Sequence, residues 1–181
     1  WSSDVCSSDL LITSFFVIPL ITFVSRKIGK KKAFIVSQLV SVIGYVLFWF
    51  LFIPGKPYMF LYALPFHSFG IGSLFTIMMS MTADICDLDE LENGNRREGV
   101  LGAVYWWMVK LGFGVAGLLS GLTLQLVGFD ADNVTEFAID GMRVFYTIIP
   151  IIGIFIAIYI MKDYEINEKR ANEIKKLLNK K

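Results

Sequence analysis

The chain has 181 residues, of which 55% are hydrophobic and 15% aromatic, whereas only 18% are charged, and its net charge is +1 at pH 7. Soluble domains carry about 25% charged residues, so this composition, with a mean hydropathy of +0.61, argues against a soluble domain and indicates a membrane protein. The nearly neutral charge argues against a nucleic-acid partner.

Enzymatic and metal chemistry have little support in the residue types. Two cysteines and a single histidine give no basis for a disulfide framework or a metal site. The sequence also lacks the H-E-x-x-H, P-loop and G-x-S-x-G motifs. We therefore predict that the protein is not an enzyme and holds no resident cofactor or metal.

The first nine residues differ from the rest of the chain. They are polar, and the tripeptide Ser-Ser-Asp occurs twice, at residues 2–4 and 7–9. They resemble a translated sequencing-adapter sequence, and they lack the basic start and long apolar stretch of a secretory signal. We interpret residues 1–9 as a non-native segment and keep a native polar outer loop as the alternative.

Five apolar stretches predict transmembrane helices, at residues 10–25, 33–53, 58–83, 99–127 and 144–161. A helix needs about 20 apolar residues to cross a hydrocarbon core of about 30 Å. The first stretch is slightly short, and we interpret it as a helix whose natural start is missing. The predicted fold class is therefore an all-α membrane protein, with a transmembrane bundle over residues 10–161.

Basic residues in the connections predict the topology. The connections at residues 25–32 and 84–98 and the tail at 162–181 together carry fourteen Lys and Arg, whereas the other two connections carry only Lys56 and Arg143. The positive-inside rule places the first set in the cytoplasm. We therefore predict a multi-pass protein of the inner (plasma) membrane whose C-terminus is cytoplasmic.

The third predicted span contains the chain's single histidine, His67. A histidine at this depth is a candidate for relaying a proton, because its ordinary pKa lies close to neutrality. The alternative, which is commoner in helix bundles, is a polar packing residue whose hydrogen bonds are satisfied.

The connection after this span is rich in charge. Asp84, Asp87, Arg96 and Arg97 lie in it together with four more acidic residues, without the spacing of a calcium-binding loop. We predict that these four residues belong to an ion-pair network that closes the cytoplasmic side and breaks when that side opens. The alternative is a solvated acidic loop.

Lys110 is the most informative residue of the sequence. It lies about 16 Å from the start of the fourth predicted span, near the bilayer midplane. A charge at this depth costs at least about 2.5–3.5 kcal/mol, so such residues usually face a cavity and a partner. Because the five spans contain no acidic residue, we expect the counter-charge on helices outside this chain. The alternative role is a purely structural buried pair.

Three aromatic residues, Tyr105, Trp106 and Trp107, come one turn before Lys110. The two tryptophans lie at i−4 and i−3 from the lysine, so at least one shares its helix face. An aromatic ring beside a charged group is a common way to bind a sugar. The alternative for these rings is contact with lipid or with another helix.

Glycines follow the lysine in the same span. Residues 112–117 match G-x-G-x-x-G, but they lie inside an apolar span that no strand precedes, so we reject a dinucleotide site. Gly117 and Gly121 form G-x-x-x-G, which predicts a close approach of another helix.

The tail predicts a short amphipathic helix over residues 165–181. Its apolar positions, set among charges, are Ile166, Ile174, Leu177 and Leu178. Such a helix is expected at the inner headgroup surface, and a solvated helical tail is the alternative.

Three segments together carry a family resemblance: residues 81–90 (MTADICDLDE), residues 94–99 (GNRREG) and residues 103–112 (AVYWWMVKLG). This order of acidic residues, Arg-Arg-Glu-Gly and intramembrane lysine resembles the glycoside–pentoside–hexuronide:cation symporter family of the major facilitator superfamily. The resemblance extends over residues 10–181 and implies helices eight to twelve of a twelve-helix transporter. It therefore implies a partial C-terminal bundle of that superfamily.

The resemblance also implies roles for individual residues. Lys110 falls on the family's intramembrane lysine, close to the shared site for sugar and cation. Positions that contact sugar fall at or near Tyr105, Trp106 and Phe75. The family's inner charge network falls on Asp84, Asp87 and Arg96. Its cation-binding aspartates lie in the N-terminal half, whose helices are missing from this chain.

We therefore expect the C-terminal part of a secondary active transporter, a sugar:cation symporter that works by alternating access. The expected partners are a glycoside, pentoside or hexuronide, Na⁺ or H⁺ as the coupling ion, the lipid bilayer and the missing N-terminal helices. One alternative is a transporter of a lipid-like or other polar solute, which a wider apolar cavity would favour. Another is a membrane sensor or scaffold, in which Lys110→Ala would change no flux.

Overall fold

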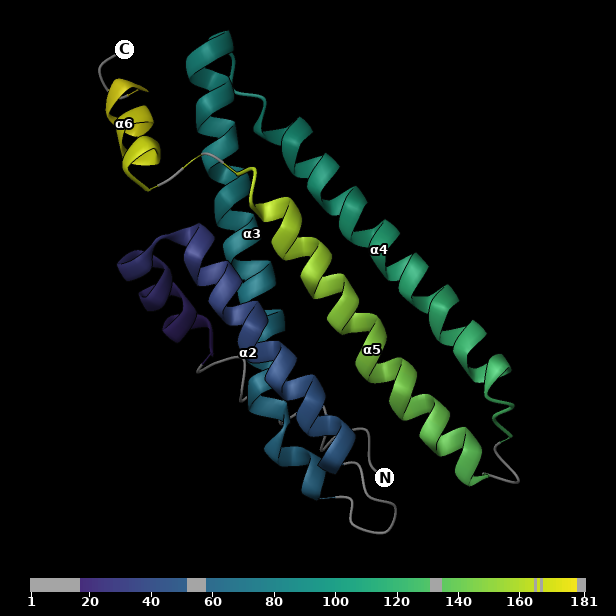
Figure 1. Ribbon diagram of the computed structural model, residues 1–181. Coiled ribbons are helices and arrows are strands. Elements are labelled where there is room, and N and C mark those ends of the chain that lie inside the picture. The colour runs from purple at the N-terminus through teal and green to yellow at the C-terminus, as the bar shows by residue number, and fades with distance from the viewer. Residues whose placement is uncertain (1–16, 52–57, 131–134, 165, 167, 179–181) are drawn as a thin grey trace.

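Figure 1 shows the computed structural model of the chain, which describes residues 17–51, 58–130, 135–164, 166 and 168–178. The predicted segment 1–9 and the first part of the first predicted span lie outside these residues. The described elements are a helix over residues 17–28, α2 (Lys30–Leu51), the short 3-10 helix η1 (Met59–Tyr62), α3 (Leu64–Asn93), α4 (Glu98–Leu126), α5 (Glu136–Met161) and α6 (Glu168–Leu178). Throughout this described part every regular element is helical, which confirms the predicted all-α fold class.

Four of the described helices, α2, α3, α4 and α5, are long and apolar enough to cross a membrane. Two of them continue beyond the stretches that the sequence predicts. α3 ends at Asn93 rather than near residue 83, and α5 begins at Glu136 rather than near residue 144. The acidic residues that we expected in a loop therefore lie mostly on the last turns of α3. Apolar composition marks only the part of a helix that meets lipid, so it does not detect turns that continue into water.

Local signals explain several helix ends. Gly29, with φ of 85°, joins the helix over residues 17–28 to α2, and Gly94, with φ of 71°, ends α3. Both angles lie in the left-handed region that glycine adopts without strain. The Gly94 N–H donates to the Glu90 carbonyl at 2.9 Å. At the start of α5, the Thr135 side chain accepts a hydrogen bond from the Ala138 N–H at 3.2 Å, as an N-cap residue does.

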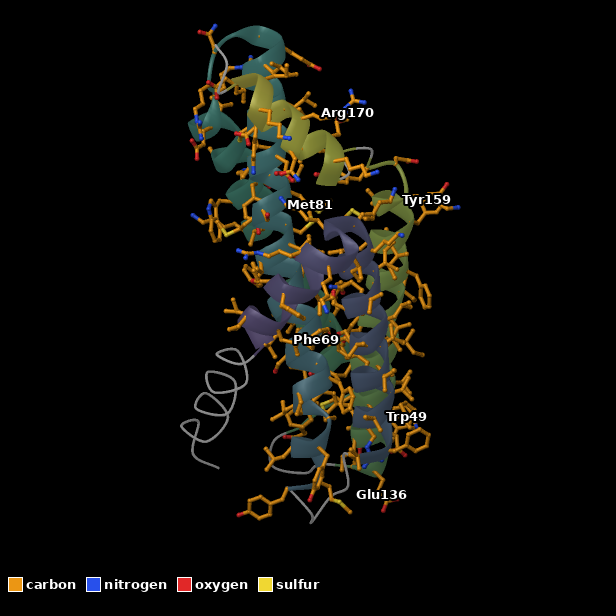
Figure 2. All side chains as sticks on the ribbon, turned by 90° about the vertical axis from the view of Figure 1, so that its left-hand side faces the viewer. Trp49, Phe69, Met81, Glu136, Tyr159 and Arg170 are labelled. Carbon is orange, nitrogen blue, oxygen red and sulfur yellow. The ribbon has the colours of Figure 1, made fainter. Side chains whose placement is uncertain are left out.

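α2, α3 and α5 lie side by side at the centre of the bundle, and α4 runs along its outer edge beside α5 (Figure 1). One end of the bundle carries Arg170 and Tyr159, and the other carries Trp49 and Glu136 (Figure 2). The core near the first of these ends brings together residues from the helix over 17–28, α2, α3 and α5: Val17, Ile21, Ala33, Phe34, Ile77, Met81 and Met161.

α2 and α3 approach closely at two glycines. A Cβ atom at Gly70 would overlap the Ser41 side chain, and one at Gly44 would lie 2.8 Å from the His67 backbone nitrogen. Beside this contact the buried Gln38 amide donates to the Gly70 carbonyl at 3.2 Å and to the Ser73 hydroxyl at 3.3 Å. Small residues with buried side-chain hydrogen bonds are the usual means by which membrane helices pack tightly.

We expect Gly70→Ala to lower the stability of the bundle by about 1–3 kcal/mol, because the added methyl group overpacks the contact between α2 and α3. The measurement is thermal unfolding of the purified protein in detergent. Gly99→Ala is the matched control, because a Cβ atom there meets nothing within 4 Å. Equal unfolding temperatures for the two variants would contradict the close contact at Gly70.

α4 differs from the other long helices because none of its residues is buried. Its glycines, including Gly117 and Gly121, would carry a Cβ atom with nothing within 4 Å. Within the described residues, therefore, no helix packs against the G-x-x-x-G surface, and the predicted close approach is not made there. Large apolar side chains such as Phe113 and Leu118 are exposed on the same helix. In a bilayer this helix faces lipid or helices that lie outside the described chain.

Candidate functional site

Lys110 lies near the middle of α4, about 18 Å along the helix from its first residue, Glu98. Its side chain is exposed. The part of the chain that the structure describes offers it no hydrogen bond or ion pair. A lysine at the middle of a membrane-crossing helix is too costly to leave without a partner. The structure thus places the predicted site residue near the middle of α4 and gives it no partner among the described residues, so a partner outside this chain stays a prediction.

The three predicted aromatic residues occupy the turn of α4 before this lysine. Trp106 and Trp107 are 47% and 60% exposed. The Tyr105 ring packs against the Trp106 ring with centroids 5.4 Å apart, in an edge-to-face arrangement. The Tyr105 hydroxyl is buried and has no hydrogen-bond partner among the described residues. Because Trp106 is at i−4 from Lys110, its indole and the lysine ammonium share one open face of the helix.

Phe75, the predicted sugar-facing aromatic of the preceding helix, is half-buried on α3. α3 packs against α4 near the turn that joins them. Phe75 makes no ring contact with Tyr105, Trp106 or Trp107 in the described structure. The structure therefore places this residue on a neighbouring helix without bringing it against the aromatic residues of α4.

His67 lies in an aromatic cluster at the other end of the bundle from Asp84. Its ring is 5.1 Å from Tyr45 and 5.6 Å from Phe48, edge to face, and both of these rings also contact Tyr146. The His67 Nδ1 atom is buried without a hydrogen-bond partner among the described residues. The structure therefore packs His67 against aromatic rings of α2, and its role as a proton relay stays a prediction.

A second polar centre lies at the end of the bundle where α6 packs against α3, and it is built around Asp84 of α3. We call Lys30, Asp84, Asp87 and Lys175 the Asp84 cluster. The Asp84 side chain is only 2% exposed, and the Lys30 ammonium lies 2.5 Å from its Oδ2 atom. The same ammonium donates to the Ser80 carbonyl at 3.2 Å. A carboxylate buried this deeply is tolerated only with a close cation, which α2 supplies from its first residue.

Two adjacent lysines at the start of α2 reach two different helices. Lys30 contacts α3, as above, whereas the Lys31 ammonium donates to the Lys162 carbonyl at 2.6 Å and to the Tyr164 carbonyl at 3.1 Å. Those carbonyls follow the C-terminus of α5, where the helix dipole favours a cation. The positive N-terminus of α2 disfavours both lysines, so these partners offset a local repulsion. The result is that the start of α2 ties α3 to the end of α5.

The Tyr164 side chain lies close to the Asp84 cluster. Burial, with the Asp84 carboxylate nearby, raises the pKa of Tyr164 to about 12. Its hydroxyl is buried and has no hydrogen-bond partner among the described residues. The phenol therefore stays neutral at physiological pH and cannot add a negative charge next to Asp84.

The two predicted arginines form a separate, exposed group at the turn between α3 and α4. Arg97 donates to both Asp89 carboxylate oxygens, at 3.0 and 2.5 Å, and Arg96 donates to Glu98 at 3.0 Å and to Glu90 at 3.5 Å. The hydrogen bond to Glu98 raises the pKa of Arg96, and the one to Asp89 raises the pKa of Arg97, so both stay charged.

The predicted network of Asp84, Asp87, Arg96 and Arg97 is thus divided in two. Among the described residues no ion pair joins either arginine to Asp84 or Asp87. The partners of Asp84 are Lys30 and Lys175, which we considered above only as basic residues that predict the topology. A carboxylate buried this deeply requires a nearby cation, so the basic segment at residues 25–32 was the available signal.

Comparison with known proteins assigns the chain to a family. A family model described as MFS/sugar transport protein, where MFS denotes the major facilitator superfamily, matches residues 6–168. The chain belongs to the MFS/sugar transport protein family. This membership confirms the resemblance to a family of sugar:cation symporters, and the four apolar helices make the chain part of a multi-pass membrane protein.

Individual proteins that are similar to the chain agree with its assignment to the MFS/sugar transport protein family. The chain is 30% identical to the glucuronide carrier protein homolog of Escherichia coli (strain K12), covering 86% of this chain and 34% of that protein. It is 26% identical to the uncharacterized symporter YnaJ of Bacillus subtilis (strain 168), covering 93% of this chain and 37% of the relative. It is 21% identical to the isoprimeverose transporter of Lactiplantibacillus pentosus, covering 88% of this chain and 33% of that protein. The chain thus spans about a third of the length of these relatives.

Proposed function

We propose that this chain is the C-terminal part of a sugar:cation symporter that carries a glycoside, pentoside or hexuronide together with Na⁺ or H⁺. The observation that carries the proposal is the open face of α4, where Lys110 lies at mid-membrane depth beside Trp106. Membership in a sugar transport family supports a sugar as the substrate, and the relatives named as symporters support a coupling ion.

The chemistry of this face suits a sugar. The lysine ammonium has three donors for sugar hydroxyls, and the exposed indole of Trp106 offers a flat apolar surface for the C–H face of a ring. Aromatic residues with one polar group are suited to ligands that are apolar on one side and polar on the other. Lys110 and Trp106 are therefore proposed as substrate-binding residues, with Tyr105 holding Trp106 edge to face.

Coupling to the cation follows from the missing counter-charge of Lys110. We place the acidic partner of the lysine on the N-terminal helices of the full-length protein. When Na⁺ or H⁺ neutralises that carboxylate, the ammonium loses its partner and turns its donors to the sugar. Cation binding would then raise affinity for the sugar, and the two would cross together as the two halves of the transporter rock around the site.

Charge asymmetry supports the orientation in the membrane. The bundle end with Lys30, Arg96 and Lys162 carries most of the basic residues. By the positive-inside rule we propose that this end faces the cytoplasm and that the protein lies in the inner (plasma) membrane. The Asp84 cluster then lies on the cytoplasmic side. There it would hold the inner ends of α2 and α3 together while the site faces outward. Neither a lipid-like substrate nor a sensor role has an observation in its favour.

The test is uptake of labelled sugars by membrane vesicles that contain the full-length protein. We expect uptake of at least one glycoside, pentose or uronide when an inward Na⁺ or H⁺ gradient is imposed, and its loss when an ionophore collapses that gradient. Vesicles without the protein are the control. Correctly inserted protein that takes up none of these sugars under either gradient would contradict the proposal.

A further inference from the structure

The C-terminal helix α6 docks on the inner end of α3 instead of lying apart from the bundle. α6 packs against α3 (Figure 1), and Ala171 and Ile174 are the residues that it buries. With 11 residues, it is shorter than the roughly 12–15 residues at which an isolated helix becomes marginally stable in water. Its helical state therefore depends on the docked position.

The electrostatic contact of α6 is weaker than that of α2 with the same aspartate. The Lys175 ammonium lies 3.8 Å from Asp84 Oδ1 and 3.9 Å from Asp87 Oδ2, both too far for a hydrogen bond. Its side chain is 53% exposed, so water and salt screen the contact. The Lys30 side chain is 23% exposed, and its ammonium lies 2.5 Å from the same carboxylate. Asp84 thus has one tight cation from α2 and one loose cation from α6.

Because of this difference, release of α6 from α3 costs little electrostatic free energy. When Lys175 leaves, Asp84 keeps Lys30, so no buried charge is left without a partner. Asp87 loses only a loose contact, and it is less deeply buried than Asp84. Loss of Lys30 would have the opposite effect, because a distant and exposed Lys175 cannot replace a hydrogen-bonded cation.

We propose that α6 is a reversible latch on the inner end of α3, helical when docked and unfolded when released, with Lys175 as its electrostatic contact. Its release opens Asp84 and Asp87 to another cation. If the proposed function holds, which this last consequence assumes, that cation comes from the N-terminal half when the cytoplasmic side closes. The latch would then set how readily the inner ends of the two halves meet.

Hydrogen exchange of the α6 amides in the full-length protein, held in lipid nanodiscs, tests the latch. We expect Lys175→Gln to speed exchange at residues 169–178 by about twofold to fivefold, the range that an exposed ion pair supports. Lys176→Gln, which removes the same charge from an exposed neighbour, should leave the rate unchanged. Raised salt should speed exchange in the wild type and have less effect in Lys175→Gln.

A second pair of variants tests the apolar contact. Ile174→Gln, at a buried position, should increase exchange more than Lys175→Gln, whereas Leu177→Gln, at an exposed position, should not. Equal exchange in wild type and in both Lys175→Gln and Ile174→Gln would overturn the latch. Exchange that depends only on whether the nanodisc lipid is anionic would also overturn it, because α6 would then belong to the membrane surface. These measurements need no transport, so their failure is distinguishable from failure of the proposed function.

Discussion

Lys110→Ala should reduce gradient-driven sugar uptake by the full-length protein about 10- to 150-fold, the loss expected when a hydrogen bond to a charged group worth about 1.5–3 kcal/mol is removed. The lysine lies near the middle of α4 with no partner in the described chain, so under the proposed function its ammonium is available to both the sugar and an acidic residue of the other half. The measurement is the initial uptake rate in vesicles, normalised to inserted protein.

Two controls separate the role of the charge from general damage. Lys110→Arg keeps the charge but changes its shape and number of donors, so it should retain part of the uptake. Lys176→Ala removes a lysine from the exposed side of α6 and should leave uptake unchanged. Exchange of labelled for unlabelled sugar without a gradient distinguishes the sugar-binding role of Lys110 from its role in coupling to the cation gradient. If Lys110→Ala retains both normal uptake and normal exchange, the residue has a structural role only.

Lys30→Met should destabilise the bundle by about 3–5 kcal/mol, because it leaves the Asp84 carboxylate buried without its hydrogen-bonded cation. The more distant Lys175 would compensate only in part. The measurement is unfolding of the purified protein followed by tryptophan fluorescence, since α2 and α4 both contain tryptophan.

The matched control is the double variant Lys30→Met with Asp84→Leu. Removing both charges leaves no unpaired group, so most of the lost stability should return, as it does when buried ion pairs are replaced by apolar residues. The non-additive part of this double-mutant cycle reports the coupling between the two residues. Simple addition of the two single effects would show that Lys30 and Asp84 act independently and would contradict the pair seen in the structure.

The depth and isolation of Lys110 could be predicted because both depend on a single helix. The apolar span sets the depth, and because the spans contain no acidic residue, the sequence predicts that the partner lies elsewhere. The aromatic neighbours also follow from helical spacing alone. Phe75 is different, because its distance from the α4 aromatics depends on how two helices are rotated against each other, which apolar composition does not determine.

The partners of Asp84 were missed for a related reason, although the basic segment at residues 25–32 offered a signal for Lys30. Six acidic and two basic residues that lie near each other in sequence suggested one network. The structure divides it because α3 continues as a helix to Asn93 and points successive side chains in different directions. Asp84 then faces the start of α2, more than fifty positions earlier in the chain, whereas Asp89 and Glu90 face the turn with Arg96 and Arg97. Pairing of this kind is set by tertiary packing.

The length of α3 gives it a mechanical property. Its 30 residues extend about 45 Å, and a hydrocarbon core takes up about 30 Å, so a stiff arm of about 15 Å projects beyond the membrane. Arg97 braces the end of this arm to the start of α4 through Asp89. A tilt of α3 by about 10° would swing its Asn93 end by about 8 Å, and the start of α4 would follow through the brace. Under the proposed function, a small rocking motion at one surface of the bilayer would thus be magnified at the other and passed to the helix that holds Lys110.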